Sequence, residues 1–375
     1  MPCYQPLVRI EYPNIKYMNK NGKISTKASI HTTTDTELED IIDGKETIKM
    51  LIPCGQCIGC RLDYSRQWAN RGYLESLLHA QNYFITLTYD NEHLPMKDFT
   101  IIEDKIYPRT EEWKGTLNKR DLQLFFKRLR DRIPKFSYMA CGEYGSENGR
   151  PHYHAILFGA ELPTETFYNP RLINHEFYYQ NDIIEECWTE EVGRGKKTGK
   201  SLGYSNISEA NWNTIAYTAR YVVKKQMGIY ADEEYKKRGQ EKEFITVSKN
   251  PAIGKEYFNL HHMDIMENDK IMIHNKNGTY EVTRPRYYDK LIEKYHEEEL
   301  KETKAKRKKI AQELAELKDT TTSLKRKQQL EVEERTQKQK TAQLLRPLDK
   351  KVVKDTIKRK ETERPRPRRE KDWMN

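Results

Sequence analysis

The chain has 375 residues, of which 36% are hydrophobic and 33% are charged, so one part can bury a core while another stays solvated. The formal net charge of +10 favours anionic partners, nucleic acid before an acidic membrane surface. No apolar run is long enough to span a bilayer, and the N-terminus lacks a signal-peptide pattern. These features exclude a membrane-spanning protein and predict a soluble, cytoplasmic one.

The predicted elements alternate between helices and strands along the first 290 residues. Strands are expected where β-branched and aromatic residues run up to turn residues, and helices where apolar residues recur at helical spacing. Two of the strands are joined by the turn ENGRP and should form a hairpin. This order predicts an α+β fold with a central antiparallel sheet and flanking helices. The expected elements are a helix at 61–79, strands at 82–95, 136–145 and 152–159, and helices at 118–135 and 210–226.

The last part of the chain differs in composition. Between Tyr295 and Trp373 there is no aromatic residue, and Lys, Glu, Gln, Leu and Ala dominate. These residues form helices readily but leave little to bury, which predicts a long charged helix or weak coiled coil followed by a disordered basic tail. We therefore expect three segments: an N-terminal strand and cysteine-rich helix (1–80) packed on a central domain (81–290), and a charged helical extension (291–375).

Two histidines stand one residue apart in the segment RPHYHAILFG. Side chains alternate along a strand, so His152 and His154 point the same way, and two protonated imidazoles so close would repel. A divalent cation would hold both rings neutral, with a third ligand from the preceding strand. Glu143 is the preferred third ligand and Glu147 the alternative. Mixed imidazole and carboxylate ligands suit Mg²⁺ or Mn²⁺ and phosphate chemistry, whereas edge histidines without a metal are the simpler explanation.

Two tyrosines lie four residues apart in the predicted helix at 210–226. Tyr217 and Tyr221 share one helix face, and Lys224 falls on the same face. They are either core tyrosines beside a lysine that reaches solvent, or a pair of phenol nucleophiles beside a cation. A phenol is a poor nucleophile at neutral pH unless a nearby cation or a polarised phosphate helps it. Combined with the predicted metal site, the pair favours a phosphodiester transesterase.

Three of the six cysteines are packed into the segment CGQCIGC. Cys54, Cys57 and Cys60 are spaced by three, and Cys3 is a candidate fourth ligand. Clustered cysteines in a cytoplasmic chain indicate metal before disulfides. We expect a structural Zn²⁺ site that ties the N-terminal strand to its domain, with an iron–sulfur cluster or reduced thiols as the alternatives.

Several segments, in this order, resemble the motifs of HUH endonucleases. They are FITLTYD, GEYGSENGRPHYHAILFG and YTARYVVKK. The complete pattern is similar to the rolling-circle replication initiators of microviruses. The segments MPCYQPL, PCGQCIGCR, FITVSKNPAIGKEYF and RPRYYDKL resemble the gokushovirus branch of that family. The resemblance covers residues 1 to 295 and leaves the charged extension outside.

The resemblance implies a nicking endonuclease at 81–290. His152 and His154 would be the paired metal ligands and Glu143 the less uniform acidic ligand. Tyr217 and Tyr221 would match the two-tyrosine form of the motif, without saying which attacks first, and Lys224 the basic position that follows them.

The same resemblance implies rolling-circle replication of circular viral DNA. One tyrosine would attack the origin and leave a 5′-phosphotyrosine link and a free 3′-OH for a host polymerase. The second would cleave the regenerated origin, and the strand would be joined into a circle. The chain has no GxxxxGK[ST] loop, so strand separation would fall to a host helicase. The implied partner is the origin of the single-stranded or replicative-form viral DNA, and the implied location is the cytoplasm of a bacterial host.

Two other functions remain open at this point. An HUH transposase or relaxase would perform the same chemistry on another element, and a single active tyrosine would distinguish it. A non-catalytic, zinc-stapled nucleic-acid-binding protein would bind DNA but never become linked to it.

Overall fold

The protein is described from a computed structural model in which the chain divides into two compact units. The first unit contains the described residues up to Tyr64, and the second begins at Ser65. The structure describes residues 3, 6–18, 24–32, 48–102, 104–111, 114–133, 135–145, 148–173, 176–190, 199–224, 231–275 and 278–319.

The first unit contains a three-stranded antiparallel sheet with the strand order β2-β1-β3. Among the side chains of these strands that the structure describes, Ile10 and Tyr12 are buried, and much of the remaining surface is exposed. The sequence predicted only one N-terminal strand, because a small and largely exposed sheet leaves little apolar alternation to detect. The strands are β1 (Leu7–Met18), β2 (Ile24–Thr32) and β3 (Ile48–Ile52), and β3 leads into α1 (Ile58–Ser76).

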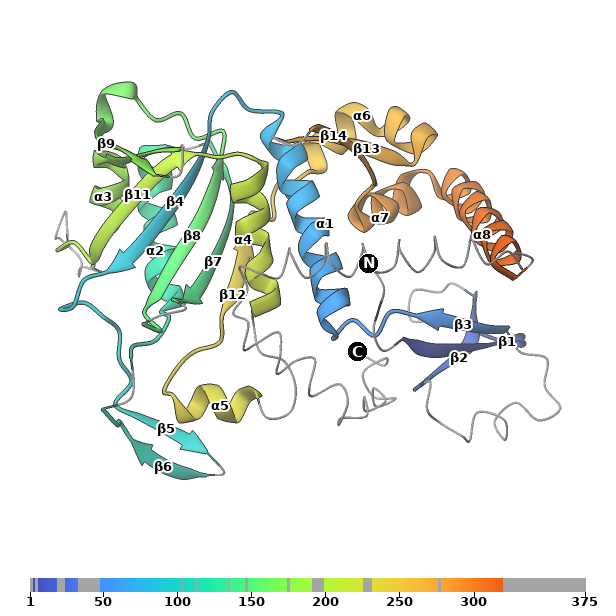
Figure 1. The fold of residues 1–375 in the computed structure, drawn as a ribbon, viewed down its shortest axis with the longest axis horizontal. Helices are drawn as coiled ribbons and strands as arrows, with labels where there is room; N and C mark the ends of the chain where they lie inside the picture. Colours follow the sequence, from blue (N-terminus) through green and yellow to red (C-terminus); the bar gives the residue numbers. More distant parts are fainter. Residues whose placement is uncertain are drawn as a thin grey trace. The chain divides into compact units, whose positions relative to one another are not determined.

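A seven-stranded sheet forms the centre of the second unit (Figure 1). Every neighbouring pair is antiparallel, so the predicted α+β fold class is confirmed. In spatial order the strands are β12 (Phe244–Val247), β7 (Ser137–Tyr144), β8 (Pro151–Phe158), β4 (Asn82–Tyr89), β11 (Gly203–Glu209), β10 (Glu176–Asn181) and β9 (Phe167–Ile173).

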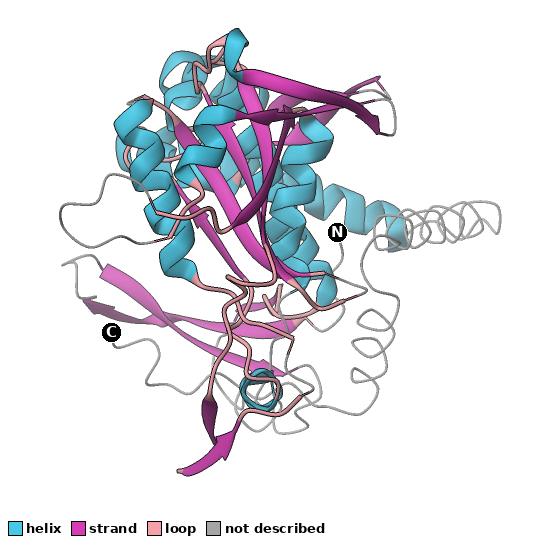
Figure 2. Ribbon diagram, turned by 90° about the vertical axis from the view of Figure 1, so that its left-hand side faces the viewer, coloured by secondary structure: helices cyan, strands magenta, loops and turns pink. Residues whose placement is uncertain are grey.

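Helices cover both faces of this sheet (Figure 2). On one face, α2 (Lys119–Arg132) and α3 (Asp182–Cys187) bury apolar side chains against alternate residues of β4, β7 and β8. On the other face lie α1 and α4 (Trp212–Lys224), with α4 packed against β7, β8 and β12. Strand alternation therefore decides which side chains of β7 and β8 meet α4.

A second cluster of buried residues joins the last turns of α1 to later elements.

Among the described helices, none combines the length and apolar character that crossing a membrane requires. The charged helix predicted for the C-terminal segment is present as α8, and residues 320–375 lie outside the described part. The remaining elements are hairpin β5 (Phe99–Ile102) and β6 (Lys105–Pro108), the short η2 (Thr164–Thr166), α5 (Ala231–Lys237), α6 (Lys255–Asn268), β13 (Lys270–Asn275), β14 (Gly278–Thr283), α7 (Arg286–Tyr295) and α8 (Glu297–Asp319).

Candidate functional site

The register of two strands brings Glu143 together with His152 and His154. Glu143 on β7 pairs directly with His152 on β8, and the alternation of β8 places His154 on the same face. The Glu143 Oε1 atom lies 2.7 Å from His152 Nε2 and 3.1 Å from His154 Nε2. The structure thus brings the three predicted ligands together, whereas Glu147 lies outside the described residues.

Both imidazoles are held through the ring nitrogen that faces away from Glu143. The Nδ1 atom of His152 lies 3.1 Å from the backbone carbonyl oxygen of Arg150, and Nδ1 of His154 lies 3.0 Å from the hydroxyl of Thr86. A carbonyl oxygen can only accept, so Nδ1 of His152 carries the proton in that bond. The Nε2 atom of a neutral His152 then presents a lone pair to a carboxylate oxygen, and either a proton or a cation must lie between them.

Electrostatics favour an ionised carboxylate at this position. Glu143 is almost completely buried, and burial alone would raise its pKa. When both imidazoles are protonated, their hydrogen bonds and positive charge outweigh burial and hold the pKa of Glu143 well below its ordinary range, and a bound cation would supply that charge when the imidazoles are neutral. The side chain is therefore a carboxylate throughout the physiological range and can serve as a metal ligand.

The donor atoms have the spacing that a small octahedral cation requires. Bonds of about 2.1 Å at right angles place neighbouring ligand atoms about 3 Å apart, close to the two distances from Glu143 Oε1. The three donor atoms all lie within 4.8 Å of one another. Two neutral imidazoles and one carboxylate therefore form a donor set that fits a divalent cation.

Helix α4 places two tyrosines against these histidines. The side chain of Asn211 accepts hydrogen bonds from the backbone N–H groups of Asn213 and Thr214, which fixes the start of the helix. Tyr217 and Tyr221 are four positions apart, so both rings fall on the face turned to the sheet. Their ring centroids lie 4.9 Å apart.

The imidazole of His154 contacts both tyrosine rings. Its centroid lies 5.3 Å from that of Tyr217 at a steep angle and 5.5 Å from that of Tyr221 in a stacked arrangement. Tyr217 is 37% exposed, whereas Tyr221 is only 4% exposed. The two tyrosine rings thus lie at similar distances from the His154 imidazole but differ sharply in access to solvent.

The surroundings of the phenols disfavour spontaneous ionisation. Burial raises the pKa of Tyr217, and the charge of Glu143 acts in the same direction. Burial also raises the pKa of Tyr221 well above its ordinary value. A nucleophilic role therefore needs a cation close to the attacking oxygen.

Arg220 is a cation that sequence reasoning did not single out. It lies between the two tyrosines in sequence, and its charge acts to lower the pKa of Tyr217. Burial lowers the pKa of Arg220, while the neighbouring phenols raise it. The segment YTARY shows this arginine between the two tyrosines, so the sequence did contain a signal for it. The predicted Lys224 ends α4, but its side chain lies outside the described residues.

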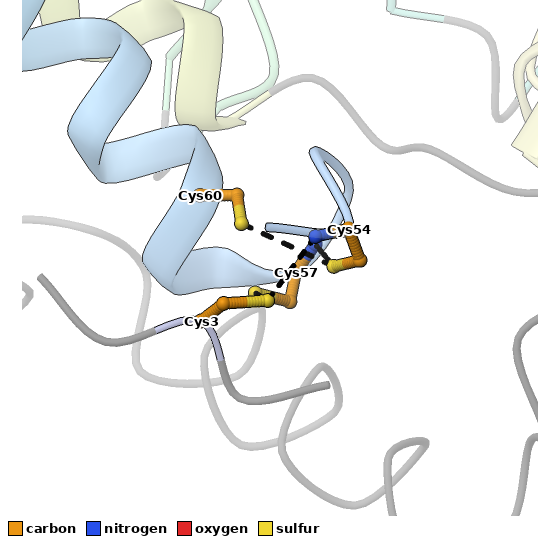
Figure 3. A group of neighbouring side chains, drawn as sticks. All are labelled: Cys3, Cys54, Cys57 and Cys60. Carbon is orange, nitrogen blue, oxygen red and sulfur yellow. Dashed lines mark hydrogen bonds between the residues drawn. The ribbon is translucent and has the colours of Figure 1, made fainter. Parts of the chain in front are cut away.

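The four predicted cysteines of the second candidate site also come together (Figure 3). Cys60 lies in the first turn of α1, Cys54 and Cys57 lie in the loop before it, and Cys3 comes from the N-terminal segment. All four belong to the first unit, and their sulfur atoms lie within 4.8 Å of one another. None of the six cysteines forms a disulfide.

Comparison with known proteins bears on the segment that carries the His–Glu–Tyr constellation. A family model described as replication-associated protein ORF2/G2P matches residues 82–226. This range contains the candidate site residues Glu143, His152, His154, Tyr217 and Tyr221. No solved structure matches the chain.

Three phage proteins are similar over much longer stretches. Replication-associated protein VP4 of Bdellovibrio phage phiMH2K is 30% identical over 301 residues, which cover 78% of this chain and 83% of that protein. Replication-associated protein ORF2 of Spiroplasma virus 4 is 28% identical over 320 residues, or 83% and 87% of the two chains. Replication-associated protein ORF4 of Chlamydia phage 1 is 28% identical over 264 residues, or 68% and 57%. The resemblance detected in the sequence is thereby confirmed, and the chain belongs to the family of phage replication-associated proteins.

Proposed function

We propose that the protein is a metal-dependent, site-specific DNA endonuclease that nicks the origin of circular viral DNA and stays linked to it through a tyrosine. One observation carries this proposal. The imidazole of His154 is bonded to Glu143 and is also in ring contact with Tyr217 and Tyr221. A phosphate bound at the metal ligands would therefore lie beside two phenol groups, as transesterification requires.

The chemistry is a transfer of one phosphodiester bond. The phenol oxygen loses its proton and forms a bond to phosphorus, and the bond from phosphorus to the 3′ oxygen breaks. The 3′ oxygen takes up a proton, and the 5′ phosphate remains on the tyrosine. Mg²⁺ or Mn²⁺, held by Glu143, His152 and His154, would supply the polarisation of the phosphate when bound. The positive charge of Arg220 stabilises the developing negative charge, and we assign the same role to Lys224, which ends this helix.

Exposure distinguishes the two tyrosines. A first attack must reach a phosphate that arrives from solvent, and Tyr217 offers the accessible hydroxyl-bearing ring. We therefore assign the first cleavage to Tyr217 and the second cleavage, which follows once DNA is bound, to Tyr221. This sequence of events would start rolling-circle replication and later rejoin the strand.

The proposed setting is the cytoplasm of a bacterial host, with a host helicase and a host DNA polymerase as partners. We assign the nicking chemistry to residues 81–290, the charged extension at 291–375 to looser contact with DNA, and the cysteine cluster within 1–80 to a structural role. A transposase or relaxase would share the chemistry, and a purely binding protein would share the charge, so the test must detect the covalent link.

The decisive experiment follows covalent capture of a labelled single-stranded origin oligonucleotide in the presence of Mn²⁺. The wild-type chain should yield an adduct that survives a denaturing gel. Tyr217→Phe should lower its initial rate at least a hundredfold, because the accessible nucleophile is gone. Tyr221→Phe should retain the first adduct and fail in strand rejoining.

Controls separate chemistry from folding. Tyr204→Phe alters an exposed tyrosine of β11 and should leave capture unchanged. His152→Ala should fold and yet lose metal-dependent nicking. An adduct that persists in the Tyr217→Phe/Tyr221→Phe double variant would refute the tyrosine assignment, and undiminished nicking by His152→Ala would refute the metal assignment.

A further inference from the structure

We propose that Cys3, Cys54, Cys57 and Cys60 bind one structural Zn²⁺ ion as four thiolates. This site lies in the first unit and uses none of the residues assigned to nicking. The ion would hold together three parts of the chain: the N-terminal segment, the loop after β3 and the first turn of α1 (Figure 3).

The sulfur–sulfur distances match those of a tetrahedron around a single metal ion. With zinc–sulfur bonds of about 2.3 Å, a regular tetrahedron has sulfur–sulfur edges of about 3.8 Å. The Sγ atoms of Cys3 and Cys57 lie 3.7 Å apart, and those of Cys54 and Cys60 lie 4.0 Å apart. These two pairs involve all four cysteines and form opposite edges of the tetrahedron.

Backbone groups are placed to stabilise thiolates at these positions. The N–H group of Cys54 donates to the sulfur of Cys3 at 3.3 Å, and that of Cys57 donates to the sulfur of Cys54 at 3.4 Å. Gly55 has a φ of 74°, a left-handed conformation that lets the loop turn back on Cys54. Such N–H donors are the outer contacts that orient and tune metal ligands.

The start of α1 also stabilises thiolates at these positions. Four thiolates around Zn²⁺ leave a net negative charge, and the positive end of a helix dipole favours negative charge within the first turn. Cys57 immediately precedes α1 and Cys60 lies in its first turn. Four protein ligands leave no open position for substrate, so the site is structural rather than catalytic.

The geometry disfavours the other uses of four cysteines. A disulfide needs sulfur atoms about 2.0 Å apart, far closer than either measured pair. In a cubane iron–sulfur cluster each cysteine binds a different iron, which separates the thiolates more widely than a single-metal tetrahedron does.

The primary test measures metal in the full-length wild-type chain, purified without chelators. Elemental analysis should find about one tightly bound zinc per chain. Titration with a mercurial thiol reagent should release that zinc in step with modification of four thiols. Replacement by Co²⁺ should produce the intense sulfur-to-metal absorption that thiolate ligands give and that imidazole and carboxylate ligands do not.

Matched variants locate the ion. Cys54→Ser and Cys60→Ser should each reduce the bound zinc to below about a tenth of an ion per chain, because each removes a ligand from a closed site. Cys187→Ala removes a buried cysteine outside the cluster and should retain the zinc. The His152→Ala/His154→Ala double variant should retain it too, which separates this site from the proposed catalytic one.

Three results would overturn the proposal. They are wild-type protein with six reactive thiols and no zinc, protein in which these cysteines form disulfides, and protein that carries iron in place of zinc. Because the metal content and the cobalt spectrum are measured on wild-type protein, a variant that fails to fold does not weaken the test. Nicking activity enters none of these readouts, so the proposal stands or falls separately from the proposed function.

Discussion

The imidazole of His154 is in contact with the other two candidate metal ligands and with both tyrosines. Its Nε2 atom faces Glu143, its Nδ1 atom faces Thr86, and its ring lies against Tyr217 and Tyr221. A residue with this many fixed neighbours cannot be moved without disturbing both the candidate metal ligands and the two tyrosines.

Thr86→Val should weaken catalytic metal binding without abolishing it. The valine keeps the shape of the side chain but removes the hydroxyl bonded to Nδ1 of His154, and removal of such an outer partner typically costs about 10-fold to 100-fold in metal affinity. The Mn²⁺ concentration that gives half-maximal adduct formation should rise accordingly. Thr88→Val, on the same strand and of the same chemistry, is the control. Equal effects of the two substitutions would contradict the assigned role.

The rate of adduct formation should rise with pH across the neutral range. Burial raises the pKa of Tyr217 above its ordinary value of about 10, so below that pKa the phenolate fraction grows about tenfold per pH unit. No plateau is expected between about pH 7 and about pH 9 in single-turnover measurements with Mg²⁺. Arg220→Gln should shift the profile to still higher pH, and Arg220→Lys should restore it. A plateau near neutral pH would show that another group limits the reaction.

At the scale of elements, the site depends on how tightly α4 is held against the sheet. Ile215 of α4 is fully buried, and the backbone of α1 comes close to it at Gly72. A Cβ atom at Gly72 would lie 2.7 Å from the Cγ2 atom of Ile215. Glycine is thus required by the close approach of two helices, and α4 carries both candidate nucleophiles.

Gly72→Ala should destabilise the protein although alanine is the better helix former. Overpacking of this kind costs about 1–3 kcal/mol, which over most of that range exceeds the roughly 1 kcal/mol that alanine gains in a helix. The free energy of unfolding from denaturant titration measures the net loss. In an Ile215→Ala background the clash is absent, so the same change should become neutral or stabilising. A gain in stability from Gly72→Ala alone would show that the helices separate at no cost.

At the scale of the whole molecule, charge and chemistry are carried by different stretches of sequence. The candidate nicking residues lie between Glu143 and Lys224, whereas the segment after residue 319 is rich in Lys and Arg. Basic segments add affinity for phosphates in proportion to the counterions they release. The net charge of +10 therefore favours binding to DNA of any sequence, and in the proposed function it does not select the cleavage site.

A chain that lacks residues 320–375 should still form the adduct with a short origin oligonucleotide. Its affinity for a long single strand should fall, and the dependence of log K on log salt should become shallower by about 0.7 for each phosphate that the protein no longer neutralises. Fluorescence anisotropy over a salt series measures both quantities. An unchanged slope would show that the segment does not touch DNA, and absence of the adduct would place part of the active site within it.

The fold class and the family follow from the sequence alone, and so do most of the candidates for both sites. Alternation along a strand put His152 and His154 on one face, and helical spacing put Tyr217 and Tyr221 on one face, because these periods are local properties of the backbone. The small exposed sheet of the first unit and the β5–β6 and β13–β14 hairpins were missed, since strands with little to bury leave little pattern in the sequence.

Only the tertiary structure decided which of these local faces meet. The β7–β8 register selected Glu143 as the partner of His152, and the packing of α4 brought the tyrosines within ring contact of His154. The tertiary structure also gave Tyr217 and Tyr221 unequal exposure. It placed Arg220 where its charge lowers the pKa of Tyr217, and it brought Cys3 close to Cys57. Strand pairing and helix packing join residues far apart in the chain, and a single sequence carries no record of those distances.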